Sequence, residues 1–309
     1  MPIRILTDDD VARALPMDLA IEGMKQAFTR LSAGKAVMPL RGRLDLPGSG
    51  GILLTMPAYV EPSLAVKIVS VYSHNPARSL PLIHAAVLAL DPATGRTLAL
   101  LEGATLTAIR TGAASGAATD ALARSDAQIV AILGSGKQAR TQLEAVAAVR
   151  HIREARVYSP TREHREAFAR ETGARAVASS EEAISGADII CTATTSATPV
   201  FDGRRLKPGV HINAVGAFSP EKQEVDADTV ARSLVVVDSR ESAVAEAGIP
   251  PDRIHAELGE ILAGRKPGRS SPAQTTYFKS CGLAVQDAVA AGIALEQATA
   301  RNLGTLVNL

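Results

Sequence analysis

The sequence has no tryptophan, and aromatic residues make up only 3% of its 309 positions. It has two cysteines, Cys191 and Cys281, whose spacing fits neither a metal motif nor a disulfide framework. Lysine and arginine number 33 against 32 aspartates and glutamates, so the net charge is +1. This balance offers no electrostatic case for nucleic acid or an anionic membrane as a partner. The scarcity of aromatic rings favours small aliphatic ligands over ligands held by stacking.

Long apolar runs and targeting signals are lacking as well. The N-terminal MPIRILTDDD does not have the basic and apolar regions of a signal peptide, and Asp287 interrupts even the long apolar run near the C-terminus. Two thiols in a chain of this length fit a reducing compartment. We therefore expect a cytoplasmic protein, and 46% apolar residues are enough to fill the cores of two domains.

The most informative stretch is a glycine turn between a strand and a helix. The short apolar run 128–133 is followed by Gly-Ser-Gly-Lys-Gln-Ala at 134–139 and by helical composition up to Val149. In a Rossmann unit the first glycine makes the tight turn, the second lets the backbone approach a pyrophosphate, and a third small residue lets the helix pack on the strand. The free N–H groups at the helix start then face the phosphates. The predicted dinucleotide site contains Gly134, Gly136, Lys137, Gln138 and Ala139.

The regions before and after this turn have different periodicities. Before it, short strands follow two helices without alternation, which predicts an antiparallel or mixed sheet. After it, short apolar strands alternate with helical or turn segments, which predicts a doubly wound parallel sheet. The fold class is therefore α/β, with a Rossmann-type sheet and a second α+β domain. The expected helices start at a Thr7–Asp10 capping box and at Asp18, with others at 105–124 and 282–300; the expected strands are 51–56, 64–72, 83–91, 97–102, 128–133, 156–159, 174–179, 188–194, 211–217 and 234–238, with 275–280 as a candidate.

The choice of cofactor depends on the end of the second Rossmann strand. An acidic residue there would bind the ribose 2′-hydroxyl of NAD and repel the 2′-phosphate of NADP. The segment after Val157 reads Tyr-Ser-Pro-Thr-Arg and has no acid. Ser159 and Thr161 can donate hydrogen bonds, and Arg162 can pair with a phosphate. We therefore predict NADP(H) as the preferred cofactor and NAD(H) as the alternative.

Two basic residues stand in apolar surroundings. Lys67 interrupts the apolar run Leu64–Val71, where a buried ammonium group needs a partner or a ligand. The alternative is a lysine that protects the edge of a sheet. Arg110 lies in a helix of small residues, where its guanidinium group suits a carboxylate or a phosphate, unless it is a surface arginine. The residues alone leave these alternatives open.

Three further residues are candidates for substrate binding or proton transfer. Arg41 and Arg43 occupy a segment before the first sheet that is expected to be a loop, and either could clamp a carboxylate or both could be solvated. Asp287 interrupts an apolar helix, which makes it a candidate for proton handling or for anchoring that helix. No metal site is predicted, because the histidines and cysteines lack metal-ligand spacing.

Several motifs form a pattern when they are taken together. They are MPAY at 56–59, Lys67, LTAIRT at 106–111, GSGKQA at 134–139, HINAVGA at 211–217, QEVD at 223–226 and FKSCGLAVQD at 278–287. In this pattern almost the whole chain resembles the ornithine cyclodeaminase/mu-crystallin family, which includes ornithine cyclodeaminases, an archaeal alanine dehydrogenase and ketimine or Δ1-pyrroline-2-carboxylate reductases. The resemblance implies a substrate-binding and dimerisation domain at 1–113 plus 283–309 and a Rossmann domain at 114–282 inserted into it.

The resemblance also implies roles for individual residues. Arg41, Lys67 and Arg110 match contacts to the substrate carboxylate, and Asp287 falls near the expected nicotinamide end. Lys67, Arg110 and Asp287 are therefore the expected catalytic residues, and the resemblance favours a functional role for Lys67. With the residues derived above, the expected cofactor contacts are Arg110, Thr111, Gly134, Gly136, Lys137, Gln138, Ala139, Ser159, Thr161, Arg162, Thr192, Thr194, Val215, Gly216, Lys222 and Ser280.

One position departs from the pattern of the cyclodeaminases. They carry a catalytic aspartate where this chain has Phe218, and Glu221 could replace it only after a loop shift. The resemblance therefore implies a homodimeric reductase that uses NADPH to convert a small cyclic imino acid, such as Δ1-pyrroline-2-carboxylate, to an L-amino acid such as L-proline. The alternatives are an ornithine cyclodeaminase, an alanine dehydrogenase and a non-catalytic ligand-binding protein like mu-crystallin.

Overall fold

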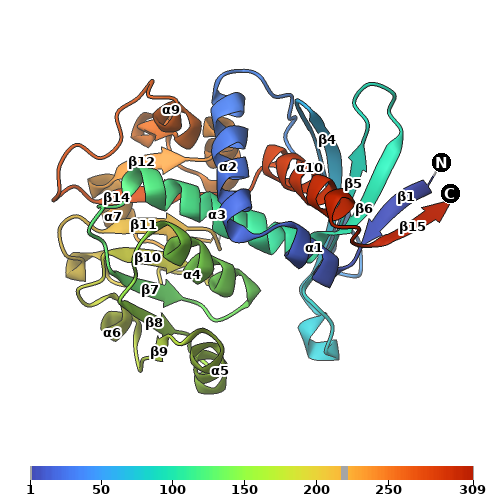
Figure 1. Ribbon diagram of the computed structural model, residues 1–309. Coiled ribbons are helices and arrows are strands. Elements are labelled where there is room, and N and C mark those ends of the chain that lie inside the picture. Colours follow the sequence, from blue (N-terminus) through green and yellow to red (C-terminus); the bar gives the residue numbers. More distant parts are fainter. Residues whose placement is uncertain (1, 217–221, 309) are drawn as a thin grey trace. The chain divides into compact units, whose positions relative to one another are not determined.

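The computed structural model describes residues 2–216 and 222–308. Its contacts divide the chain into two compact units: unit 1 is Met1–Arg110 with Leu283–Leu309, and unit 2 is Thr111–Gly282. The chain passes from unit 1 to unit 2 inside helix α3 (Gly103–Leu122) and returns after Gly282. Figure 1 labels most of the helices and strands of both units.

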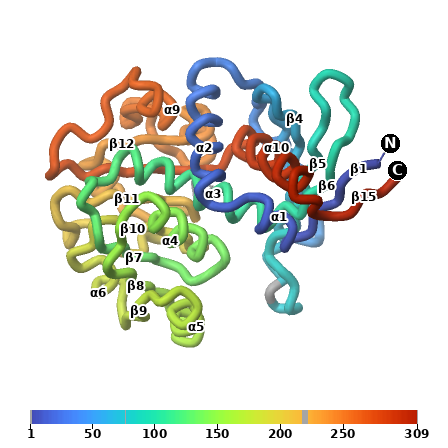
Figure 2. The backbone as a smooth tube through the Cα atoms, in the orientation of Figure 1, coloured from blue at the N-terminus to red at the C-terminus, as the bar shows by residue number. Residues whose placement is uncertain are grey.

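Unit 1 is built on a seven-stranded mixed sheet with the order β15-β1-β6-β5-β4-β3-β2. Strands β2 to β6 pair antiparallel with one another, whereas β1 runs parallel to β6. β1 also pairs antiparallel with β15, which brings the two ends of the chain side by side (Figure 2). The strands are β1 (Pro2–Leu6), β2 (Gly42–Leu46), β3 (Gly51–Val60), β4 (Ser63–Tyr72), β5 (Ile83–Leu90), β6 (Thr97–Glu102) and β15 (Thr305–Asn308).

Helices α2 (Met17–Ser32) and α10 (Ala284–Ala300) supply the apolar cover of this sheet. α10 packs against β3, β4 and β5 and against α2 (Figure 1). Close packing is possible because the residues facing inward are small: a Cβ on Gly292 would lie 2.4 Å from the Ser63 hydroxyl, and Ala291 and Ala294 are fully buried. The shorter helix α1 (Asp8–Ala14) starts at the predicted capping box, in which Thr7 and Asp10 bond each other's backbone.

Unit 2 contains an eight-stranded parallel sheet with the order β13-β12-β14-β11-β10-β7-β8-β9. Read from β9 to β11, this is the 3-2-1-4-5 order that begins a Rossmann sheet, with β7 as the first strand. The sixth position is taken by β14, which follows β12 and β13 in the chain. The strands are β7 (Ile129–Leu133), β8 (Glu154–Tyr158), β9 (Arg175–Ala176), β10 (Ile189–Thr192), β11 (His211–Ala214), β12 (Leu234–Val237), β13 (Ala256–Glu257) and β14 (Thr276–Lys279).

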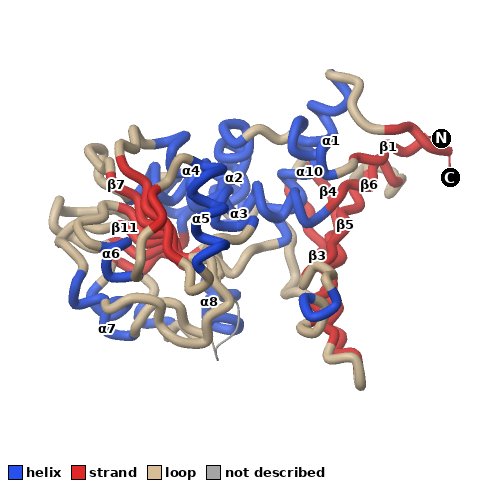
Figure 3. The backbone as a smooth tube through the Cα atoms, turned by 90° about the horizontal axis from the view of Figure 1, so that it is seen from below, coloured by secondary structure: helices blue, strands red, loops and turns tan. Residues whose placement is uncertain are grey.

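Helices lie on both faces of this sheet, as Figure 3 shows. Neighbouring residues of one strand enter different cores: Ile132 belongs to the cluster that contains Phe168, whereas Leu133 belongs to the cluster that contains Ile184. This alternation is what a doubly wound sheet requires. Within the described ranges, no helix combines the length and apolarity needed to cross a membrane. The helices of unit 2 besides α3 are α4 (Lys137–Val149), α5 (Arg162–Thr172), α6 (Ser180–Ile184), α7 (Ala227–Arg232), α8 (Arg240–Ala247) and α9 (Leu258–Leu262).

Some expectations about local structure were wrong or incomplete. Arg43 lies in strand β2 rather than in a loop, and Asp18 lies in the first turn of α2, whose N-cap residue is Pro16. The short strands β1, β2, β13 and β15 were not predicted, because so few residues carry little periodic signal; β2, β13 and β15 lie at sheet edges, and β1 lies between β15 and β6. The candidate strand at 275–280 is present as β14, and it lies inside the sheet between β11 and β12.

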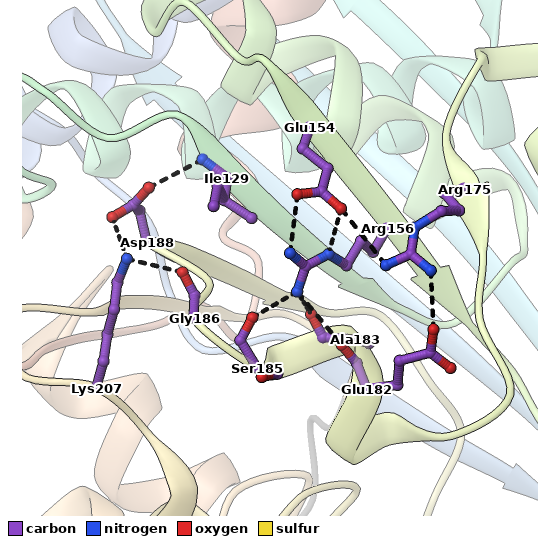
Figure 4. Close-up of polar contacts among 10 residues, drawn as sticks. All are labelled: Ile129, Glu154, Arg156, Arg175, Glu182, Ala183, Ser185, Gly186, Asp188 and Lys207. Atoms are coloured by element: carbon purple, nitrogen blue, oxygen red, sulfur yellow. Dashed lines mark hydrogen bonds and ion pairs between the residues drawn. The ribbon is translucent and has the colours of Figure 1, made fainter.

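A polar network closes the amino ends of the unit 2 strands (Figure 4). Asp188, just before β10, accepts hydrogen bonds from the backbone N–H groups of Gln128 and Ile129, both at 2.9 Å, and pairs with Lys207 at 2.6 Å. Arg156 bonds both carboxylate oxygens of Glu154 and reaches carbonyl groups at the end of α6. These contacts lie at the edge of the sheet opposite the glycine turn, so we assign them a role in stability.

Candidate active site

Lys67 lies in the middle of β4, an inner strand of the unit 1 sheet. It pairs with Met56 of β3 on one side and with Val87 of β5 on the other, and its side chain is 2% exposed. The interpretation of Lys67 as a sheet-edge lysine is therefore wrong. Side chains alternate along a strand, so Lys67 shares its face with the buried Ala65 and Val69, toward the layer that contains α10.

Asp287, in the first turn of α10, joins Lys67 to Arg110. Lys67 Nζ lies 2.7 Å from Asp287 Oδ2, and Arg110 Nε donates to Asp287 Oδ1 at 2.9 Å. All three side chains are more than nine-tenths buried, so the surface-arginine interpretation of Arg110 is wrong too. The partial positive charge of the helix start further favours the Asp287 carboxylate. The structure thus brings the three predicted catalytic residues into direct contact.

Gln286 orients this cluster and was missed by sequence reasoning. Its Oε1 accepts a hydrogen bond from the Leu283 backbone N–H at 2.6 Å and another from Arg110 Nη1 at 3.3 Å. Its side chain is fully buried. The turn that starts α10 therefore holds Arg110 at two points, through Gln286 and through Asp287. The only hint in the sequence was that Gln286 and Asp287 are consecutive polar residues in an apolar run.

The charges around Lys67 favour an added anion. The pKa of the Lys67 ammonium group is lowered to about 7: burial has the largest effect, the Arg110 charge acts in the same direction, and Asp287 acts in the opposite direction. The charge of Arg41 also lowers the pKa of Lys67, which places Arg41 within electrostatic reach of the cluster. Arg43 instead pairs with Asp45 at an exposed position. Because Lys67 and Arg110 share the single carboxylate of Asp287, a substrate carboxylate would restore the charge balance at this site.

The glycine turn after β7 has the geometry that a pyrophosphate requires. Gly134 has φ +113°, and a Cβ there would lie 2.4 Å from the Ala193 carbonyl oxygen, so only glycine fits. A Cβ on Gly136 would meet nothing within 4 Å, which leaves room for a ligand. Gly136 is also the N-cap of α4, and no side chain caps that helix. Lys137 and Gln138 begin α4, and Ala139 is buried against the sheet, so the turn fits a dinucleotide phosphate.

Arg140 was not predicted and supports this turn. Its Nη1 donates to the carbonyl oxygens of Ser135 at 2.7 Å and Gly136 at 3.1 Å, and its Nε donates to Glu171. The guanidinium group also lies over the Phe168 ring. Because Arg140 binds the carbonyl groups of the turn from one side, the backbone N–H groups of the turn face the opposite side.

The residues predicted to select the cofactor follow β8. Ser159 is buried and forms a hydrogen bond of 2.9 Å between its hydroxyl group and that of Ser135 in the glycine turn. Thr161 is the N-cap residue of α5 and Arg162 begins that helix, where it is exposed and pairs with Glu166. The end of β8 and the loop after it carry no acid, so a 2′-phosphate meets no carboxylate at this position.

The remaining predicted cofactor contacts lie mostly at the carboxyl ends of the other strands. Thr192 ends β10 and is buried, and the Val215 N–H bonds the Thr192 carbonyl oxygen at 3.1 Å. Ser280 follows β14, and its hydroxyl group donates to Asp238 at 3.0 Å. Thr194 and Gly216 both bond Glu224, which was not predicted. Two predicted contacts lie apart from these: Lys222 is exposed in a loop, and Thr111 is buried in α3.

Two residues discussed from the sequence lie outside the described ranges. Phe218 and Glu221, which bear on the cyclodeaminase alternative, belong to the segment 217–221. Among the residues that the structure does describe, no group of histidine, cysteine, aspartate or glutamate side chains is arranged to hold a metal ion.

Comparison with known proteins identifies the family. Residues 3–302 match the model of the ornithine cyclodeaminase/mu-crystallin family. The chain belongs to this family. A similar family protein, Δ1-pyrroline-2-carboxylate reductase from Bacillus cereus, is 39% identical over 97% of this chain and 98% of its own length.

Two solved structures are similar over the full length. Δ1-Pyrroline-2-carboxylate reductase from Thermococcus litoralis, in complex with NADH and L-proline, is 42% identical, with a TM-score of 0.94 and coverage of 99% of this chain and 100% of the other. An archaeal alanine dehydrogenase dimer with bound NAD is 34% identical, with a TM-score of 0.93 and full coverage of both chains. Both resemble this chain across the two units.

Proposed function

We propose that this family member is an oxidoreductase that reduces a small cyclic imino acid, such as Δ1-pyrroline-2-carboxylate, to an L-amino acid such as L-proline. The observation that carries the proposal is the buried Lys67–Asp287–Arg110 cluster, in a chain that also has a Rossmann glycine turn. The similar proteins named for this activity in Bacillus cereus and Thermococcus litoralis support it.

In this proposal the two domains have different binding roles. The domain at 1–113 plus 283–309 binds the substrate carboxylate through Arg41, Lys67 and Arg110 and forms the dimer. The domain at 114–282 binds the dinucleotide at the glycine turn and at the carboxyl ends of its strands. The positions of the buried cations and of the phosphate-compatible turn support the two binding roles.

The protein side chains supply positioning and charge rather than a nucleophile. Reduction of the imine carbon needs a hydride, which a reduced nicotinamide held at the glycine turn would supply, and the product nitrogen needs a proton. Arg41, Lys67 and Arg110 hold the carboxylate next to that carbon and fix its orientation. Asp287 keeps Lys67 and Arg110 in place and favours the protonated form of Lys67. A lysine with a pKa of about 7 can also hold the proton that the product nitrogen requires.

Alanine dehydrogenase activity is the second candidate, because the archaeal alanine dehydrogenase is nearly as similar in structure. That reaction runs the same hydride step on the linear imine of pyruvate and ammonia. A direct assay separates the two: we expect purified protein to oxidise NADPH with Δ1-pyrroline-2-carboxylate much faster than with pyruvate plus ammonia. Faster turnover of pyruvate plus ammonia would make alanine dehydrogenase the first candidate and imino-acid reduction the second. Turnover of neither, with ornithine converted to proline and ammonia, would refute the reductase proposal.

We further propose that NADPH is preferred over NADH. Support comes from Arg162, which is exposed at the start of α5, where it pairs with Glu166 and carries a guanidinium group that suits a phosphate. The variant Arg162→Ala should raise KM for NADPH by about tenfold and leave KM for NADH unchanged. The matched control is Arg170→Ala, at the other end of the same helix, which should change neither constant. A wild-type enzyme that favours NADH would overturn the preference.

We also propose a homodimer formed through the outer face of the unit 1 sheet. The register places Leu44, Tyr59 and Ile68 on the face opposite Lys67, and all three are more than one-third exposed. Apolar side chains gathered on one sheet face are typical of a subunit interface. Light scattering should give twice the 32.1 kDa chain mass for the wild type and a single chain mass for Ile68→Glu. A monomeric wild type would refute this proposal.

A further inference from the structure

We propose that Glu224 is a positioning residue for the nicotinamide half of the dinucleotide site. It ties together the loops that follow β10 and β11, the two strands next to the glycine-turn strand β7 on one side. The inference rests on the proposed dinucleotide function. It adds a role for Glu224, which was not among the expected cofactor contacts and acts by holding the backbone of the site.

Both carboxylate oxygens of Glu224 are engaged. Oε1 accepts hydrogen bonds from the Thr194 backbone N–H at 2.7 Å and from the Thr194 hydroxyl group at 2.8 Å. Oε2 accepts a hydrogen bond from the Gly216 backbone N–H at 2.8 Å. One side chain therefore connects two loops that are separated by more than 20 residues in sequence.

The environment of Glu224 explains why a carboxylate is needed. The residue is 3% exposed, so its charge is stabilised mainly by hydrogen bonds from within the protein. Its backbone carbonyl also accepts a hydrogen bond from the Val200 N–H at 2.9 Å, which holds the start of the side chain in place. A glutamine could accept on one side, but its NH2 group would then face an N–H donor on the other.

Gly216 gives independent evidence of how tightly these loops are joined. A Cβ at this position would lie 2.3 Å from the Thr194 carbonyl oxygen and 2.5 Å from Glu224 Oε1. On the other side, Gly134 approaches the Ala193 carbonyl oxygen so closely that a Cβ would lie 2.4 Å from it. At Gly134 and at Gly216 the backbone thus packs against the loop after β10 without room for a side chain.

The position of these loops in the sheet assigns them to one half of the cofactor. A Rossmann sheet consists of two mononucleotide-binding halves, and the dinucleotide crosses the sheet at the glycine-turn strand. The β8 side carries Ser159, Thr161 and Arg162, which were assigned to the adenosine ribose. The β10 and β11 side therefore receives the nicotinamide half, and Glu224 fixes the backbone on that side alone.

The test compares Glu224→Gln with a matched variant, Asp188→Asn. Asp188 is also a buried carboxylate of unit 2 that accepts two backbone N–H bonds, but it lies at the opposite, amino edge of the same sheet (Figure 4). For each protein, calorimetry measures Kd for NADPH and for 2′,5′-ADP, which represents only the adenosine half. If the wild type prefers NADH, the probes are NADH and ADP. Thermal unfolding measures the stability of each variant.

We expect Glu224→Gln to raise Kd for the whole dinucleotide by about tenfold and to leave Kd for the adenosine-half probe unchanged. Asp188→Asn should lower the unfolding temperature and change neither Kd. Equal weakening of both probes by Glu224→Gln, or no weakening, would overturn the positioning role. If Glu224→Gln does not fold, Thr194→Val removes the hydroxyl donor to Glu224, together with the acceptor of the Ser196 N–H, and should show the same selective effect to a smaller extent.

The failure of this inference can be distinguished from failure of the proposed function. A wild-type protein that binds neither NADPH nor NADH would refute the dinucleotide function and the role of Glu224 with it. A wild-type protein that binds and turns over the dinucleotide, with a Glu224→Gln variant of equal affinity, would refute the role of Glu224 alone.

Discussion

Lys67→Met should lower kcat/KM for the imino acid by about 10²- to 10³-fold and leave the affinity for NADPH unchanged. Lys67 supplies a positive charge at a site with 2% exposure, where no water can replace it. Methionine has nearly the same length and volume, and Asp287 keeps its second partner, Arg110, so the cluster can remain folded. The measurement is steady-state oxidation of NADPH together with calorimetric binding of NADPH.

Two further variants, Lys207→Met and Lys67→Arg, show whether the loss of activity comes from the charge of Lys67. Lys207→Met removes another ion-paired lysine, the partner of Asp188 at the amino edge of the unit 2 sheet, and should keep full activity. A Lys67→Met enzyme with wild-type kcat/KM would contradict the proposed role of Lys67.

Lys67→Arg keeps a positive charge at this position and tests whether the titration of Lys67 controls the pH dependence of activity. Because the pKa of Lys67 is about 7, wild-type kcat/KM should decline as pH rises through that value and the ammonium group loses its proton. Arginine stays charged throughout, so the decline should disappear in the variant. The substrate imine titrates identically with both enzymes, so a decline that persists in Lys67→Arg belongs to the substrate. A bound carboxylate favours the charged lysine, so kcat should decline at higher pH than kcat/KM.

Asp287→Asn should both destabilise the protein and abolish most activity. The substitution leaves Lys67 and Arg110 without their shared counter-charge at a site where all three side chains are buried. Removing one partner of a buried ion pair costs about 3–5 kcal/mol. Because Asp287 raises the pKa of Lys67, its loss should also leave Lys67 largely neutral at pH 7. Thermal unfolding and NADPH oxidation at several pH values measure the two effects.

The matched control is Asp126→Asn. Asp126 pairs with Arg124 at 2.5 Å, closer than either contact of Asp287, but its side chain is 65% exposed. Solvent screens such a pair, so this variant should unfold at nearly the wild-type temperature and keep its activity. An Asp287→Asn protein as stable and active as Asp126→Asn would show that the buried cluster has no special role.

Residue patterns were sufficient for the Rossmann part of the molecule. The glycine turn was predicted from Gly134, Gly136 and Ala139, and the structure explains each: a positive φ, open space and a buried helix contact. The regular alternation of strands and helices after it predicted a doubly wound parallel sheet, which unit 2 contains. These features are local or periodic, so a single segment carries enough information to predict them.

Side chains that hold the sites from a distance were not predictable in the same way. Gln286, Arg140 and Glu224 were missed because their own segments do not show which groups they bond. Each acts by hydrogen bonds to backbone groups or to another polar side chain, and those contacts form only after the chain has folded. The short strands β1, β2, β13 and β15 were missed for a related reason, since they form only by pairing with neighbouring strands in the folded sheet.

The sequence by itself determined the fold class, the family and the list of candidate residues, because these follow from periodicity, composition and motifs along the chain. Only the tertiary structure decided between a sheet-edge Lys67 and a buried one, and between a surface Arg110 and one held by Asp287. The reason is physical: what a charged side chain does depends on its neighbours and on its access to water. For Lys67 and Arg110 that neighbour is Asp287, which lies more than 170 residues further along the chain and reaches them only in the folded protein.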